Sequence, residues 1–431
     1  MSRSIMNSII SKQTKYYAIL LILYLILNIA QAKDEINTIP KLTLKSAIEL
    51  ALNNHPSINK TYAQLKAIEQ KSKQAGLLAD PRLVLNTSNL PVNNFSLSQT
   101  PMTQVQLGLI QSIPYPGKLS LQAKVAEEQT KAMNTNIDDT KRQLRQLVKH
   151  NWWELFYIDQ TLQTISESEK LLTELVNAAE TKYSVGQGSQ QDVLLAHLEI
   201  SKIEDHKRHT LTLREKIKIL LNSLFNRPNA SKIYPDNEIK MIFPNLQSLE
   251  SLIDIADKHR PELKRVDHEI AAAKNRVSLA EKEKYPDFNV GVIYGWRKSE
   301  TDLLNVQLSM NLPFYVDKKI NRKKDQRNSE WLQQRFNKDE IRNNIIKEIG
   351  QAKADYQFAT EQFDLLKTRI IPQATQTVDI MLSGYQVNNV DFLDLSRSQI
   401  NLLNFQLQYW RAYANAKQSL AAIEAATGRK L

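Results

Sequence analysis

The apolar residues of this chain follow a helical period over much of its length. From Ile345 to Ile370, every position reached by alternating steps of four and three residues is apolar. The same steps from Leu144 to Val176 meet apolar residues at all but two positions. A period of about 3.5 residues is typical of helices that pair or supercoil. The pattern therefore predicts long helices that pack side by side.

Other segments alternate with a period of two, which is typical of β-strands. Apolar side chains occupy every second position of Phe288–Trp296, Leu304–Leu312 and Val105–Leu109, and a weaker alternation covers Arg82–Asn89. Strands of about nine residues with one apolar face fit the length of an outer-membrane strand. A single hairpin of this kind is better interpreted as a soluble hairpin packed on a helix. Two hairpins, each between long helices, favour membrane strands.

The second half of the chain repeats the first after roughly 200 residues, which indicates a duplicated module. Pro56 returns as Pro261, and Tyr183 returns as Tyr385. Each repeat is expected to hold a helix, a β-hairpin, a long helix and a further helix. We place the first repeat at 33–230, with a hairpin at about 82–113 and helices at 118–185 and 192–225, a linker at 231–248, and the second repeat at 249–431, with a hairpin at about 287–313 and helices at 317–385 and 394–426.

Glycine and proline are placed so that one very long helix is possible. The chain has only ten Gly in 431 residues, and neither Gly nor Pro occurs between Gly117 and Gly186. A helix over the whole of 118–185 would be about 100 Å long at 1.5 Å per residue. Few globular domains need such a helix, so this length argues for an extended molecule.

The first residues indicate export. Arg3, Lys12 and Lys15 precede the apolar stretch Ala18–Ile29, and Ala30–Ala32 gives a small-residue cleavage pattern. We therefore expect a signal peptide at 1–32, with an uncleaved membrane anchor as the alternative. The chain has no Cys, so it is not a lipoprotein acylated at an N-terminal Cys, and it has no disulfide. After Ala32 no stretch approaches the roughly 20 apolar residues of a spanning helix.

Four strands in each chain imply an assembly. An open sheet edge leaves backbone groups without partners in lipid, so a sheet in a bilayer must close into a barrel. Single-chain bacterial barrels begin at about eight strands. Several chains must then share one barrel, and three chains would supply twelve strands. The long helices would form a tube below it. The predicted fold class is mainly α with membrane β, in which coiled-coil-like helices form an α-barrel.

Several motifs resemble those of the TolC family of outer-membrane efflux proteins. They are the hairpin end Ser112–Lys118, the turn Tyr183–Leu194 with its copy, and the repeat end Leu420–Arg429. The resemblance implies a homotrimer with a twelve-stranded barrel in the outer membrane of a Gram-negative bacterium and a helical periplasmic tunnel. It also implies docking on an inner-membrane pump through a periplasmic adaptor. The segment Asp80–Gln104 resembles the branch that serves proton-driven RND pumps for heavy metals and drugs.

The resemblance assigns roles to residues of the two helix–helix turns. Asp192 and Asp394 would narrow a cation-selective mouth, and Tyr385 would help to hold it closed. The turns would contact the adaptor through five residues, which are Val185, Gly186, Gly188, Val387 and Asn388. From the residues alone, each Asp could equally be the N-cap of the helix that follows it.

The second turn departs from the family pattern. Arg397 stands where a second acidic residue is expected, Val390 replaces an arginine, and Asn388 replaces a glycine. Asp391 is the residue that could supply the missing negative charge. The hydrogen-bond network that closes the mouth is therefore not predictable from the pattern.

No sequence pattern indicates catalysis. The chain lacks a Ser-His-Asp arrangement, a phosphate loop and an HExxH motif, so we expect no enzyme activity, no cofactor and no metal site. His206 and His209 share a helical face, but this face is better interpreted as solvated. The basic run Lys318–Lys324 does not indicate nucleic acid in an exported chain. It would face outer-membrane lipid head groups, line the tunnel or simply be solvated.

The sequence favours a passive exit duct for small molecules or metal cations delivered by a pump. Within the same class, the alternative is an exit duct for type I protein secretion. From another class, the alternative is a periplasmic coiled-coil adaptor or scaffold. An adaptor has no need of amphipathic strands of membrane length, so the strands of 288–312 argue against it.

Overall fold

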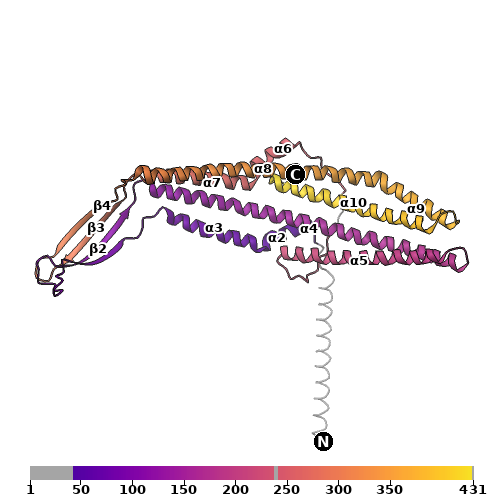
Figure 1. Cartoon of the computed structure of the whole chain (residues 1–431), viewed down its shortest axis with the longest axis horizontal. Helices are drawn as coiled ribbons and strands as arrows, with labels where there is room; N and C mark the ends of the chain where they lie inside the picture. Colours follow the sequence, from indigo (N-terminus) through magenta and orange to yellow (C-terminus); the bar gives the residue numbers. More distant parts are fainter. Residues whose placement is uncertain (1–41, 237–240, 430–431) are drawn as a thin grey trace, which may run out of the picture.

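The computed structural model describes residues 42–236 and 241–429. Figure 1 shows an elongated molecule in which long helices run side by side from a small β-sheet at one end to two helix–helix turns at the other. The signal peptide expected at 1–32 lies outside the described residues. The mainly helical fold with one four-stranded sheet confirms the fold class predicted from the sequence.

The two halves of the chain carry similar elements in the same order. The first half comprises α2 (Leu44–Asn54), α3 (Pro56–Ala75), β1 (Arg82–Ser88), β2 (Gln104–Ile113), α4 (Lys118–Ser184) and α5 (Gln190–Leu224). The second half comprises α6 (Leu249–His259), α7 (Pro261–Lys282), β3 (Phe288–Trp296), β4 (Leu303–Met310), η1 (Val316–Asn321), α8 (Arg322–Leu365), η2 (Leu366–Ile370), α9 (Ile371–Gln386) and α10 (Phe392–Thr427).

Local sequence explains where these helices begin and how far they run. Thr43 caps α2 in a capping box with Ser46. Pro56 and Pro261 occupy the first turns of α3 and α7, where a missing N–H costs nothing. Helix α4 has 67 residues because neither Gly nor Pro interrupts it. None of the described helices is both long and apolar enough to cross a bilayer.

The second long helix differs from the single α-helix expected at 317–385. It consists of α8 and α9, preceded by the π-helical turn η1 and joined by the π-helical turn η2. Pro372 stands at the second position of α9, directly after η2. Proline lacks an N–H and its ring clashes with the carbonyl one turn earlier, and a wider π-helical turn relieves both problems. Helices α5 and α10 each begin two residues before the predicted start, at Gln190 and Phe392.

The sheet is antiparallel and has the order β1-β2-β3-β4. One face is apolar right across it. Leu83 pairs with Leu109, Leu109 with Val292, and Val292 with Val306, and all four side chains are exposed. The opposite face carries Asn86, which donates to Gln106 Oε1 at 3.1 Å. Strands β1 and β4 are the two open edges of the sheet.

The helices form a layer whose edges continue those of the sheet. Helix α4 packs against α3, α5, α7 and α10, and α8 packs against α7 and α10. The layer therefore runs from α3 and α5 through α4, then α7 and α10, to α8. Because α3 leads into β1 and β4 leads into α8, the edges of the layer and of the sheet lie on the same two sides.

The segment that links the two halves of the chain packs against α8 and α10 through aromatic side chains. The ring centroid of Phe243 lies 5.1 Å from that of Phe363 and 5.7 Å from that of Tyr413. Tyr356 donates its hydroxyl to the carbonyl oxygen of Pro244 at 2.7 Å. Lys417 donates to the carbonyl oxygen of Ile242 at 3.0 Å. The two repeats are thus joined at mid-length by packing as well as by the chain.

Candidate functional site at the helical tip

Two turns lie together at the end of the molecule opposite the sheet, one between α4 and α5 and one between α9 and α10 (Figure 1). We call residues 182–192 and 384–394 the tip. Gly186 has φ of 73°, and the N–H of Gln187 donates to the carbonyl of Lys182 at 2.8 Å. Asn388 has φ of 61°, and the N–H of Asn389 donates to the carbonyl of Gly384 at 2.8 Å. Both turns therefore have the same left-handed helix cap.

Asp192 and Asp394 are not the N-caps of α5 and α10, the alternative that the sequence left open. Ser189 is the N-cap of α5, and its hydroxyl accepts from the N–H of Asp192 at 3.1 Å. Asp391 is the N-cap of α10, without a side-chain hydrogen bond to the helix. Asp192 and Asp394 each stand three residues after the cap, so the N-cap interpretation of these two residues is wrong. Their carboxylates still lie beside the positive end of a helix dipole.

A cleft of about 430 Å³ separates the two turns. Asp394 does not line it: this residue lies further along α10, exposed, with an oxygen 3.6 Å from Arg397. Val185 and Val387 project outward, with 62% and 64% of their surface exposed. Six of the residues predicted from the sequence do line the cleft, namely Gly186, Gly188, Asp192, Tyr385, Asn388 and Asp391.

Tyr385 and Phe392 are the two buried hydrophobic residues of the tip. Only 5% of the surface of Tyr385 is exposed, and the centroid of its ring lies 5.7 Å from that of Phe392 in an edge-to-face arrangement. Its hydroxyl has no hydrogen-bond partner among the described residues. Burial raises the pKa of this hydroxyl, and the nearby charge of Asp192 raises it further. The side chain therefore holds its proton and packs as a hydrophobic group.

Lys182 connects the two turns and was not singled out from the sequence. Its Nζ donates to the carbonyl oxygen of Tyr385 and, at 2.6 Å, to Oδ1 of Asn388. The same atom lies 4.2 Å from the centroid of the Tyr385 ring. A basic residue in the last turn of α4 was visible in the sequence, but nothing there indicated that it reaches the other turn.

The corresponding position in the second turn is Gly384, so the connection is not reciprocal. A Cβ atom at Gly384 would lie 2.5 Å from Cγ2 of Val390. The side chain of Val390 therefore occupies the space that a longer residue at 384 would need. Val390 is the residue that replaces the arginine expected from the resemblance, and Lys182 brings a cation to this second turn from the first turn.

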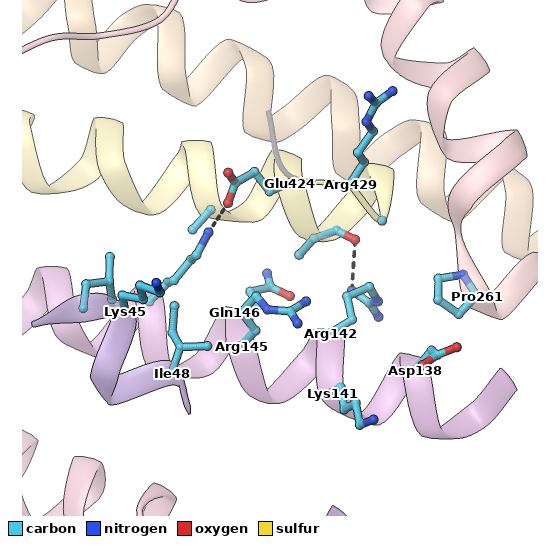
Figure 2. Close-up of a pocket in the computed structure, with 15 residues that line it drawn as sticks. Lys45, Ile48, Asp138, Lys141, Arg142, Arg145, Gln146, Pro261, Glu424 and Arg429 are labelled. Carbon is cyan, nitrogen blue, oxygen red and sulfur yellow. Dashed lines mark hydrogen bonds and ion pairs between the residues drawn. The ribbon is translucent and has the colours of Figure 1, made fainter. Parts of the chain in front are cut away.

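A larger cleft of about 770 Å³ lies at mid-length, between α2, α4 and the end of α10 (Figure 2). Arg142 donates to the carbonyl oxygen of Ala425 at 3.2 Å, and Arg260 donates to the same oxygen at 2.8 Å. Lys149 pairs with Glu424. These cations neutralise the carbonyl end of α10 and fasten it to α4 and α7. The cleft therefore lies where the two repeats are joined, between α2 and α4 of the first repeat and the end of α10 of the second.

Potential metal ligands do not gather at either cleft. Across residues 42–236 and 241–429, no group of three His, Asp or Glu side chains is arranged to hold a metal ion. Lys323 of the basic run pairs with Glu283, the C-cap of α7, and Lys324 pairs with Glu281 in the last turn of α7.

Comparison with known proteins agrees with this architecture. The model of the outer membrane efflux protein family matches residues 47–225 and 252–429, which covers both repeats. The chain belongs to the outer membrane efflux protein family. The predicted family is thereby confirmed, and members of this family are channels rather than enzymes.

Solved structures of other outer-membrane channels share the fold. VceC of Vibrio cholerae superposes with a TM-score of 0.76 at 16% identity, covering 90% of this chain and 96% of that one. CusC gives a TM-score of 0.78 at 14% identity, covering 90% and 92%. MtrE of Neisseria gonorrhoeae, in its open state, gives 0.74 at 16% identity, covering 90% and 89%.

One curated relative is also similar in sequence. The toxin and drug export protein A of Aggregatibacter actinomycetemcomitans is 22% identical over 273 residues. The match spans 58% of this chain and 55% of that protein, so it covers only about half of the relative's length.

Proposed function

We propose that three copies of this chain form one passive exit duct in the outer membrane of a Gram-negative cell. Each copy contributes four strands to a twelve-stranded barrel and its helices to a periplasmic tube. Small molecules or metal cations enter at the tip, delivered by an inner-membrane pump of the proton-driven RND type through a periplasmic adaptor. The observation that carries the proposal is the open, apolar sheet, which cannot be stable in a bilayer as a single copy.

The sheet supports sharing between copies. The exposed apolar face across β1 to β4 suits lipid, whereas the edges β1 and β4 expose unpaired backbone groups. Such groups cost several kcal/mol each in hydrocarbon, so edge β4 must pair with β1 of another copy. Channels of this family form trimers, which favours three copies over two.

The edges of the helical layer also require contact with neighbouring copies of the chain. Its α5 edge exposes Leu194 and Leu198, and its α8 edge exposes Phe336 and Phe358 with 70% and 65% of their surface accessible. Apolar side chains repeated along both edges mark an interaction surface. Joining α8 of one copy to α5 of the next would cover them and close the tube.

We assign the discrimination between cations and anions to the tip. The described strands carry a single charged residue, Arg82, at the start of β1, so the barrel wall offers little discrimination by charge. At the tip, three copies of Asp192, Asp391 and Asp394 would surround a narrow mouth. A ring of carboxylates attracts cations and repels anions. Val185 and Val387, exposed on the outer side of the turns, are assigned to adaptor contact.

Protein secretion is the second candidate. It is favoured by the name of the curated relative, a toxin and drug export protein, although that match covers about half of each chain. A strain lacking this protein distinguishes the two. Sensitivity to metals or small toxic compounds supports efflux, whereas loss of a secreted protein from the medium supports secretion.

Fractionation and conductance test the duct itself. We expect the protein in the outer-membrane fraction, and we expect the purified full chain to give cation-selective single channels in planar bilayers. Asp192→Asn with Asp391→Asn should reduce the preference for cations, whereas Asp138→Asn, at the mid-length cleft, should not. A non-conducting protein confined to the soluble periplasmic fraction would exclude the proposal.

A further inference from the structure

We propose that the mid-length cleft binds an extended acidic peptide segment of a partner protein. This binding site goes beyond the proposed duct function and does not depend on it. The cleft measures about 770 Å³, a volume typical of ligand pockets. Its lining includes two acids, Asp138 and Glu424, and six cations, namely Lys45, Lys141, Arg142, Arg145, Lys149 and Arg429. This excess of positive charge favours an anionic ligand.

Half of these cations have no acidic partner in the structure. Arg142 and Lys149 form ion pairs within the chain. By contrast, Lys45, Arg145 and Arg429 are exposed, and none of their side chains forms an ion pair or a hydrogen bond within residues 42–236 and 241–429. Figure 2 shows Arg145 in the space between α4 and the end of α10. The charges of these three side chains are therefore available to a ligand.

The cations of α4 form a row along the helix. Lys141, Arg145 and Lys149 follow one another at intervals of four residues, so they lie about 6 Å apart along one face. Lys141 donates to the hydroxyl of Tyr62 at 3.1 Å, a neutral partner that leaves its charge uncompensated. An extended peptide presents every second side chain on one face, at intervals of about 6.6 Å. Carboxylates at alternate positions of such a peptide would meet the row.

Apolar side chains in the same cleft argue for a peptide over a free phosphate. Leu44 and Ile48 of α2, Pro261 of α7 and Ala421 of α10 all line it. A phosphate group is bound best where several N–H donors converge on one point. Cations spread along a helix and accompanied by apolar surface instead suit a chain in which acidic and apolar residues alternate.

The two repeats pack their short helices in the same way, so their residues can be compared position by position. Leu144 and Val148 of α4 share a hydrophobic cluster with α2. Ile345 and Ile349 of α8 share one with α6. The aligned segments thus occupy equivalent places in the two halves of the molecule.

The second repeat lacks the row of cations at the equivalent positions. The counterparts of Lys45, Arg145 and Lys149 are, in that order, Glu250, Ile346 and Gly350. Arg342, the counterpart of Lys141, is held by Asp257 at 2.8 Å. Packing of the short helix on the long one therefore does not require these cations, and a ligand of the first repeat accounts for them.

The cleft remains accessible in the proposed assembly. Helices α4 and α10 lie within the helical layer, whereas the edges assigned to contacts between copies are α5 and α8. A partner could therefore reach the cleft without displacing a neighbouring copy.

Binding of a model peptide to the purified full chain tests the site without relying on conductance. The probe is a fluorescein-labelled octapeptide of alternating Glu and Ala, followed by anisotropy at low ionic strength. Lys45→Gln with Arg145→Gln should weaken its binding by about tenfold, because two unpaired cations of the cleft are lost. The matched control, Lys170→Gln with Arg322→Gln, makes the same charge change at exposed positions elsewhere and should bind as the natural protein does. Equal affinities of the two double variants would overturn the inference.

Two further measurements test the class of ligand and its location. Inorganic phosphate at the same concentration of negative charge should leave the peptide bound, and complete displacement would refute the peptide as the ligand. A photo-crosslinking form of the peptide should attach within 44–48 of α2 or 138–149 of α4, and attachment confined to other segments would refute the location. A protein that binds the peptide in the cleft but never conducts would retain this site and refute the duct.

Discussion

At the scale of single residues, the two turns of the tip show how one backbone conformation is reached by different side chains. The left-handed position is Gly186 in one turn and Asn388 in the other, and both form the same 2.8 Å cap bond. Glycine and asparagine are the residues that tolerate this conformation best. The departure at Asn388, which was visible in the sequence, therefore leaves the turn intact and adds an acceptor for Lys182.

The buried hydroxyl of Tyr385 predicts a pH dependence. Its pKa is raised above the ordinary value of 10.0, so the folded protein keeps the proton at a pH where the unfolded chain has lost it. The stabilisation is complete below that value and is lost as pH rises through the higher pKa of the folded state. Tyr385→Phe should remove this loss and change stability little at neutral pH, because the hydroxyl has no partner among the described residues.

The measurement is the midpoint of denaturant unfolding at several pH values on either side of the tyrosine pKa. Tyr183→Phe is the control, since Tyr183 is its equivalent in the first turn and is 49% exposed. A Tyr385→Phe profile that falls above this pKa as steeply as that of the natural protein would contradict the prediction.

Alanine substitutions at two glycines should change the free energy of unfolding in opposite directions. Gly428 has φ of 73°, and a Cβ atom there would lie 2.9 Å from the carbonyl oxygen of His259. Gly428→Ala should cost at least about 1–2 kcal/mol through the left-handed backbone alone. Gly350 lies within α8 with nothing within 4 Å of its Cβ position, so Gly350→Ala should stabilise by about 0.5–1 kcal/mol. Thermal unfolding of both variants checks this, and a shared sign would refute it.

At the scale of elements, the joint between the sheet and the helices contains a partly buried ion pair. Lys118 begins α4 and is 7% exposed. Its Nζ lies 2.8 Å from Oδ1 of Asp287, which also accepts from the N–H of Tyr115 at 2.7 Å. The rings of Tyr115 and Tyr285 stack at 4.3 Å beside it. Residues just after β2 and just before β3 are thereby held together.

Removing the cation of this joint should loosen the sheet from the helices. Lys118→Met leaves the carboxylate of Asp287 without its charge partner, and we expect a loss of about 1–3 kcal/mol. Lys318→Met, at an exposed position of the basic run, should be nearly neutral. Denaturant unfolding measures both changes, and limited proteolysis at residues 114–117 should accelerate only in Lys118→Met. Equal stability of the two variants would argue against this role for the pair.

The elements themselves were largely predictable because each has a strong local signal. The stretch without Gly or Pro that becomes α4, the period of two in β3 and β4, and the prolines at the start of α3 and α7 all act within a few residues. The π-helical turns were not predictable. Pro372 indicated an irregularity, but whether a helix kinks, breaks or widens depends on packing with neighbours such as α10.

The contacts of the tip were predictable only in part, for the same reason. Duplication placed Tyr183 with Tyr385 and Asp192 with Asp394, and so located the two turns. The bond of Lys182 joins residues 203 positions apart, to the carbonyl of Tyr385, and it has no counterpart in the other repeat. Comparing the two repeats position by position therefore does not reveal this bond, because Gly384 occupies the position equivalent to Lys182.

At the scale of the whole molecule, a single copy is an incomplete structure. Its sheet has two unpaired edges, and its helical layer exposes apolar side chains along the matching edges. The sequence anticipated the need for partners, because four strands are too few to close a barrel. It could not indicate that sheet and layer end on the same sides, which follows from the way α3 leads into β1 and β4 leads into α8.

The proposal that three copies complete one another can be tested by native mass spectrometry of the full chain extracted from outer membranes. We expect a particle of three chains that persists in detergent and, when reconstituted, forms channels. A monomer that remains folded and forms channels by itself would contradict the trimeric assembly.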